Sequence, residues 1–266
     1  MASDAPKGPL GWVAGLGRVS LAGVAAVGRV GQFATRGVSA AISPPWYPRQ
    51  ILAQFWAVGF LSLPVVGLSA WFIGAALALN IYGAGDRFNA ETVMPQIVAL
   101  GITRELGPVM AALMLAGRVA SAMASEIGAM RATEQIDAME TLSTDPRRYL
   151  IAPRLIAATI SLPLLTLVAD VIGVLGGMQV SKLLIDLPPK IYIQTTADFI
   201  TRWDVESGVI KSAVFGFIIG LMGCYHGNNA KGGARGVGRA TTSAMVSSAV
   251  LILASDYLLT SIFARG

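Results

Sequence analysis

The sequence predicts an all-α integral membrane protein with an N-terminal amphipathic helix, five transmembrane helices and a short cytoplasmic helix. Of the 266 residues, 54% are apolar and only 13% are charged, about half the charge of a typical soluble domain. No charged residue lies between Arg49 and Asp86. A hydrocarbon core about 30 Å thick requires about 20 apolar residues of helix, so this segment is long enough to cross it.

Residues 1–48 are expected to form a cytoplasmic or interfacial amphipathic segment. Arg18, Arg29 and Arg36 fall on one helical face, because they are separated by nearly whole numbers of turns. Such a helix would lie in the membrane interface with its arginines toward anionic headgroups. A flexible glycine-rich leader is the alternative interpretation. Residues 44–48, Pro-Pro-Trp-Tyr-Pro, end the segment and place two aromatic residues at the interface.

A five-helix domain, residues 49–266, is expected to follow. Its orientation is predicted from the basic residues of the connections, because cytoplasmic loops carry an excess of Lys and Arg. With the N-terminus in the cytoplasm and the C-terminus outside, twelve basic residues lie inside and five outside. The predicted spans are 51–80, 93–124, 150–181, 207–227 and 238–262. The inner basic residues are Lys7, Arg18, Arg29, Arg36, Arg49, Arg131, Arg147, Arg148, Arg154, Lys231, Arg235 and Arg239, and the outer ones are Arg87, Lys182, Lys190, Arg202 and Arg265.

The second and third spans are expected to be interrupted rather than uniform. Backbone groups freed within a membrane are tolerated only where they line a cavity or are covered by protein. Several glycines and prolines near charged residues therefore indicate a functional region. The second span contains Gly101, Gly107-Pro108 and Gly117, and the third contains Pro163, Gly173 and Gly176-Gly177.

Charged residues within the spans are the main candidates for function, because charge inside a membrane is costly. Arg104 and Glu105 diverge by about 100° around a helix, so their partners should come from other helices. Lys211 and Asp256 are the candidates, since both lie near the outer ends of their spans. These residues could form an interhelical salt bridge that only fixes packing, or a polar ring that holds an amphiphile's headgroup. Asp170 is a further charged residue in the third span.

In the second interpretation, a lipid would be bound by a charged group and an apolar surface. The Arg104 guanidinium would grip a headgroup phosphate through two parallel hydrogen bonds. Glu105, Lys211 and Asp256 would balance and orient it. The acyl chains would lie against Leu77, Leu106, Val109, Met110 and Leu113.

The segment 126–142 predicts a short acidic amphipathic helix on the cytoplasmic side. Ala132, Ile136 and Met139 fall on one face, and acidic residues cluster on the adjacent one. Such a helix suits docking of a soluble partner, although an ordinary solvated loop helix is the alternative. Asp145-Pro146 then forms a turn. The candidate docking residues are Glu134, Gln135, Ile136, Asp137, Met139 and Glu140.

Other classes of function find no support in the sequence. The net charge is +5, but no basic run with interleaved aromatics indicates nucleic-acid binding. Cys224 is the only cysteine and His226 the only histidine, so we expect no disulfide and no metal site. The glycine-rich segment 232–242 lacks the Gly-Lys-Ser/Thr ending of a phosphate-binding loop and is interpreted as a cytoplasmic turn. No catalytic motif is present, and we expect no bound cofactor and no ATP hydrolysis by this chain.

Several ordered motifs resemble the MlaE-type permease family of ABC transporters, and the similarity covers about residues 50–262. They are Arg104-Glu-Leu-Gly-Pro108 continuing to Ala116-Gly-Arg118, Met130-Arg-Ala-Thr-Glu-Gln-Ile-Asp137-Ala-Met-Glu140, Phe215-Gly-Phe, Gly223-Cys-Tyr-His-Gly227 and Gly236-Val-Gly-Arg-Ala-Thr-Thr242.

The resemblance implies a homodimeric permease in the bacterial inner membrane that moves glycerophospholipid or a related lipid between the inner and outer membranes. It implies cytoplasmic ATPase subunits that bind ATP and magnesium and dock on the helix around Glu134–Glu140. It also implies a periplasmic MCE-domain partner and a STAS-type subunit.

Two alternatives come from other classes. One is an ion- or proton-coupled secondary carrier with Asp170 and Asp256 as coupling sites, although five spans give no paired repeats. The other is an intramembrane enzyme that acts on lipids, for which the sequence offers no catalytic set.

Overall fold

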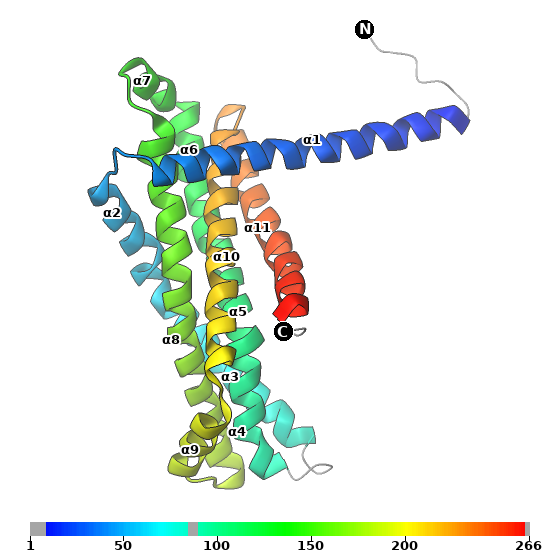
Figure 1. Ribbon diagram of the computed structural model, residues 1–266, viewed down its shortest axis with the longest axis vertical. Coiled ribbons are helices and arrows are strands. Elements are labelled where there is room, and N and C mark those ends of the chain that lie inside the picture. The colour runs from blue at the N-terminus through cyan, green and yellow to red at the C-terminus, as the bar shows by residue number, and fades with distance from the viewer. Residues whose placement is uncertain (1–8, 85–89, 264–266) are drawn as a thin grey trace.

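The computed structural model describes residues 9–84 and 90–263, and all regular elements in these ranges are helices. Most of them form an elongated bundle, from one end of which α1 (Pro9–Ile42) projects sideways (Figure 1). The all-α prediction is confirmed. Lys7, Arg87 and Arg265, which the predicted orientation includes, lie outside the described residues.

Five helical segments are long and apolar enough to cross a membrane, as the sequence predicts. Each extends beyond the predicted bounds, because the helices continue through the polar residues that flank the apolar stretches. The segments are Pro48–Gly83, Val93–Ala132, Arg147–Ile185, Arg202–Asn228 and Gly233–Phe263.

The first two segments are irregular. The first consists of α2 (Pro48–Val58), a 3-10 turn η1 (Phe60–Ser62) and α3 (Leu63–Ala84). The second is interrupted as predicted, because π-helical turns lie beside its glycines. It consists of α4 (Ala90–Gly101), the π segment η3 (Ile102–Leu106), α5 (Gly107–Leu115), the π segment η4 (Ala116–Ala120) and α6 (Ser121–Ala132).

The predicted interruption of the third segment is wrong in position. A π segment η5 (Arg147–Ile151) begins it, but α8 (Ala152–Ile185) then continues through Pro163 and the glycines without a break. The glycines instead allow close packing of α8 on α3. A Cβ at Gly173 would meet the Ala70 carbonyl oxygen at 3.3 Å, and one at Gly176 would collide with the backbone of Trp71.

The predicted single helix at 126–142 is two helices. α6 ends at Ala132, and α7 (Gln135–Thr141) begins after Glu134. Glu134 has φ 58°, in the left-handed region, so the chain turns there and α7 caps one end of the bundle (Figure 1).

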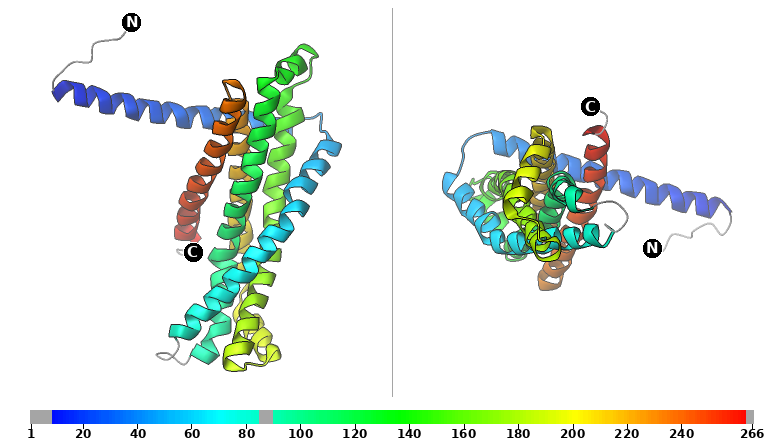
Figure 2. Two further views of the ribbon diagram at one scale, coloured as in Figure 1. Left: turned by 180° about the vertical axis from the view of Figure 1, so that it is seen from behind. Right: turned by 90° about the horizontal axis from the view of Figure 1, so that it is seen from below.

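The last elements are α9 (Pro189–Phe199), α10 (Arg202–Asn228) and α11 (Gly233–Phe263). The sequence did not predict α9, which lies at the end of the bundle opposite α7 (Figure 1). α10 is the most buried of the five membrane segments, with 67% of its most apolar part inside the structure, whereas the value for α11 is 11%, and α11 lies at the side of the bundle (Figure 2). The main core cluster is built from small and apolar side chains, including Ala112, Leu162 and Phe215.

Candidate functional site

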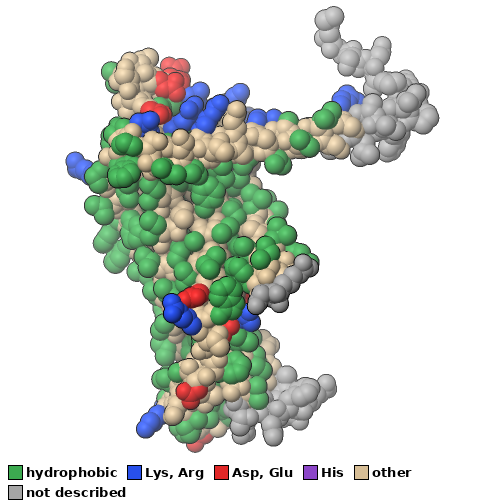
Figure 3. Space-filling view, viewed as in Figure 1, with side chains coloured by type: hydrophobic (Ala, Val, Ile, Leu, Met, Phe, Trp, Pro, Cys, Tyr) green, Lys and Arg blue, Asp and Glu red, His purple; other side chains and the backbone are tan. Residues whose placement is uncertain are grey.

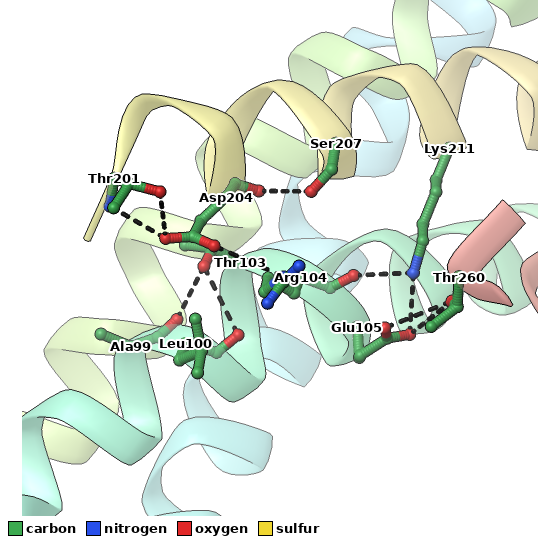
Figure 4. Close-up of polar contacts among 10 residues, drawn as sticks. All are labelled: Ala99, Leu100, Thr103, Arg104, Glu105, Thr201, Asp204, Ser207, Lys211 and Thr260. Carbon is green, nitrogen blue, oxygen red and sulfur yellow. Dashed lines mark hydrogen bonds and ion pairs between the residues drawn. The ribbon is translucent and has the colours of Figure 1, made fainter. Parts of the chain in front are cut away.

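A lysine within the bundle is the centre of the candidate site. Lys211 on α10 is 2% exposed, and its Nζ lies 2.9 Å from Glu105 Oε2 and 3.2 Å from Asp256 Oδ1. The ammonium also donates a hydrogen bond of 3.0 Å to the carbonyl oxygen of Arg104 (Figure 4). Thr260 donates a hydrogen bond of 3.3 Å to Glu105 Oε1. We call these five residues the Lys211 cluster, and they join the second, fourth and fifth membrane segments.

The π segment η3 explains how this cluster is built. Arg104 and Glu105 both lie in it, and a π turn disturbs the regular ladder of an α-helix, as is frequent at functional sites. The Arg104 carbonyl accepts a hydrogen bond from the Lys211 ammonium. A buried ammonium requires such compensation, because an unpaired charge in a low-dielectric interior is costly. The prediction that Glu105 finds its partners on other helices is confirmed.

The Arg104 side chain has a partner that the sequence analysis missed. Arg104 Nε lies 3.4 Å from Asp204 Oδ1, and the Asp204 side chain is 9% exposed. Asp204 also accepts hydrogen bonds from Thr201 N at 2.9 Å and Thr201 Oγ1 at 2.7 Å (Figure 4). The Thr-x-x-Asp spacing of a capping box at the start of α10 is the sequence signal that could have identified Asp204.

The cluster is buried at its centre and open at its edge. Whereas Lys211 is enclosed, the side chains of Arg104 and Glu105 are 37% and 41% exposed, and that of Asp256 is 19% exposed. The arrangement can therefore offer both a guanidinium and carboxylates to a polar group at the surface of this chain.

Asp170 does not join the Lys211 cluster. It lies on α8, is buried, and its Oδ1 has no hydrogen-bond partner among the described residues. This oxygen fills the space beside Gly107, where a Cβ would collide with it. A side chain at position 107 would therefore require the Asp170 carboxyl group to move.

The five apolar residues predicted to hold acyl chains are divided among different surroundings. Leu106 and Met110 line a narrow cavity of about 10 Å³ between α3, α5 and α8, which has room for about one water. Val109 packs against the main core cluster, and Leu77 packs against a separate cluster that includes Val98. Leu113 is half-buried.

The candidate docking residues at α7 differ in their exposure to solvent. Glu134, Gln135, Asp137 and Glu140 are exposed. Ile136 is buried, and Met139 packs against the same core cluster, which includes Leu150. The apolar face of α7 therefore holds it on the bundle, and its polar face is available to a partner. Asp137 Oδ1 is paired with Arg131 Nη1 at 2.6 Å.

Comparison with known proteins gives a family match over most of the chain. The model of the family described as Permease MlaE matches residues 51–262. A protein of Rickettsia felis, named as a probable ABC transporter permease protein, is 49% identical over 237 residues, which cover 89% of this chain and 92% of that relative.

More distant relatives extend the similarity. A probable ABC transporter permease protein of Synechocystis is 39% identical and covers 82% of this chain and 83% of its own length. The intermembrane phospholipid transport system permease protein MlaE of Haemophilus influenzae is 35% identical and covers 80% of this chain and 82% of its own length.

Proposed function

This chain belongs to the MlaE permease family, and on that premise we propose that it is the permease subunit of an ABC transporter that moves phospholipid between the inner and outer bacterial membranes. ATP hydrolysis, with its magnesium, would take place on a separate subunit. The name of the Haemophilus influenzae relative supports the phospholipid substrate, and that of the Rickettsia felis relative supports the ABC transporter class.

The Lys211 cluster is the observation on which the substrate proposal depends. A phospholipid headgroup carries an anionic phosphate, and a mostly apolar site binds it best with a few placed cations. The partly exposed Arg104 guanidinium is the cation that a headgroup can reach. The buried Lys211 ammonium holds Glu105 and Asp256 in place beside it. When a lipid binds, the Arg104 guanidinium would give up its contact with Asp204 and contact the phosphate.

The faces that this chain leaves open support the proposed assembly. The fifth segment, Gly233–Phe263, is apolar enough to cross a membrane, yet only 11% of its most apolar part is buried. A second copy of the chain against this helix would form a homodimer and enclose the open side of the Lys211 cluster. Cytoplasmic ATPase subunits would dock at α7, and a periplasmic MCE-domain protein would meet the opposite end. A STAS-type subunit would bind the ATPase.

The substrate proposal is tested with Arg104→Ala. If Arg104 binds the phosphate, the variant assembles normally but retains at least about 10-fold less phospholipid through purification, because charge-assisted hydrogen bonds to the phosphate are lost. Mass spectrometry of the bound lipid and the dimer yield are measured on the same preparation. Arg202→Ala is the matched control. Arg202 lies at the start of α10, two residues before the Asp204 that pairs with Arg104, and its side chain is 91% exposed.

Two results would count against this role. Normal lipid content in a well-assembled Arg104→Ala complex would remove Arg104 from the lipid site. Failure of assembly would instead indicate that Arg104 only fixes packing, because its loss leaves the largely buried Asp204 carboxylate without its cation.

A further inference from the structure

A cavity lies where α1 meets the corner formed by α6, α7 and η5. Its volume is about 610 Å³, within the range of about 300–1,000 Å³ that is typical of small-molecule sites. Asn228, which also lines it, is 17 residues beyond Lys211 on α10, or about 25 Å along the helix at 1.5 Å per residue. The cavity is therefore separate from the Lys211 cluster. Basic side chains gather along this end of the bundle beside α1 (Figure 3).

More positive than negative side chains line the cavity. Four arginines and two carboxylates contribute to its wall. Arg131 is already paired with Asp137, and Asp145 is paired with Arg148 at 3.6 Å. The remaining lining charges are Arg29, Arg36, Arg147 and Glu140, and none of these has an ion pair among residues 9–84 and 90–263. Three guanidinium groups therefore face one carboxylate.

The faces of α1 place this cavity at the depth of lipid headgroups. Arg29 and Arg36 lie on the same face of α1, while Gly37 is buried against Leu155 of the bundle. A third face of α1, about 160–240° around the helix from the arginines at 100° per residue, carries apolar side chains that are exposed in the part of the chain that the structure describes. Such a helix lies in a membrane surface with its apolar face in the acyl region. The exposed apolar residues are Val24, Val27, Val38 and Ile42.

We propose that this cavity binds the phosphate of an anionic phospholipid from the leaflet in which α1 lies. The arginine fork matches phosphate geometry and binds it through parallel hydrogen bonds. Arg29 and Arg36 come from α1, whereas Arg147 comes from η5, so one phosphate would connect α1 to the corner that carries α7. The lipid would act as a fixed structural ligand there and not as transported substrate.

The test measures binding of short-chain phosphatidylglycerol to the purified full-length chain in detergent. The triple variant Arg29→Gln, Arg36→Gln, Arg147→Gln should bind at least about 10-fold more weakly than the wild type, because three charges that attract the phosphate are removed. The matched control is Lys231→Gln, Arg235→Gln, Arg239→Gln, which removes the same charge at the same end of the bundle outside the cavity. Both triple variants retain the Lys211 cluster, so lipid bound there contributes equally.

A variant that binds more tightly shows that the arginine variant loses affinity through its charges and not through unfolding. Glu140→Gln removes the unpaired carboxylate of the lining and should tighten phosphatidylglycerol binding about 2- to 5-fold. Short-chain phosphatidylcholine, whose headgroup is neutral overall, should bind more weakly than phosphatidylglycerol.

Three outcomes would overturn the proposal. Equal binding by the two triple variants would remove the cavity as the site. Full competition by inorganic phosphate at the lipid's own concentration would indicate a free phosphate site. Loss of ATPase association in the arginine variant, with lipid binding unchanged, would indicate that an acidic protein segment fills the cavity.

Discussion

Buried or partly buried cations of this protein donate hydrogen bonds to backbone carbonyl groups at places where the helices are irregular. Lys211 donates to the Arg104 carbonyl in η3, and Arg154 Nη1 donates to the Leu150 carbonyl in η5 at 2.9 Å. Arg118 Nη1 donates to the Ala57 carbonyl at 3.2 Å and to Ser62 Oγ at 2.5 Å, beside the break between α2 and α3. In a membrane these carbonyls have no water to bind, so each charge also satisfies the backbone.

Arg118 gives a prediction for this structural role. Arg118→Gln should reduce the free energy of unfolding by about 1–3 kcal/mol, because the Ala57 carbonyl and the buried Ser62 hydroxyl lose their donor. Thermal unfolding of the purified protein in detergent measures the change. Arg202→Gln, which removes an exposed ion pair with Glu206, should shift the melting temperature little. Equal shifts in the two variants would contradict the structural role of Arg118.

At the scale of the elements, the packing of α3 on α8 depends on glycines. Gly176→Ala should lower stability by about 1–3 kcal/mol, because the added Cβ would lie 3.1 Å from the Trp71 carbonyl carbon, within rigid backbone. The control is Gly238→Ala on α11, where no atom lies within 4 Å of the added Cβ; it should be neutral or stabilising. Melting temperatures of both variants in detergent test the prediction, and an unchanged Gly176→Ala protein would contradict it.

The exposed face of α7 gives a sharper test of docking than the sequence alone allowed. Asp137 is paired with Arg131, so reversing its charge would also disturb the bundle. Glu134 is exposed and has no ion pair among the described residues. Glu134→Lys should therefore weaken association with the ATPase by about 10-fold or more if the docking surface is basic. Asp198→Lys on the exposed surface of α9, at the other end of the bundle, is the matched control.

The measurement for this prediction is co-purification of the ATPase with the permease, together with the ATPase rate of the complex. If Glu134→Lys and Asp198→Lys copurify the ATPase equally well, α7 is not the docking element.

At the scale of the whole molecule, the turns of the chain are divided between the two ends of the bundle. α1, α7 and the turn before α11 lie at one end, and α9 lies at the other (Figure 1). The basic residues predict that the first end faces the cytoplasm. A cysteine at residue 186 should then react with an impermeant maleimide from the periplasm, and one at residue 234 should not. Both positions are exposed, and the native Cys224 is buried. The reverse labelling pattern would overturn the orientation.

Much of the site could be predicted from the sequence because charge within a membrane is rarely neutral in function. Glu105, Lys211 and Asp256 were identified in this way, and the structure brings them together. Asp204 was missed because it lies at the start of a helix, where an acidic residue is ordinary. Thr260 was missed because a threonine in a membrane helix carries no distinguishing signal.

The sequence by itself determined the helical class, the five membrane-length segments and the family, because hydropathy and ordered motifs are local properties of the chain. Only the tertiary structure decided which charges pair, that Pro163 leaves α8 intact and that Glu134 divides α6 from α7. It also decided that four arginines meet at one cavity, three of them without an ion pair among the described residues. These features depend on contacts between residues far apart in the chain. Side-chain direction and backbone irregularity set such contacts, and neither can be read from the spacing of residue types.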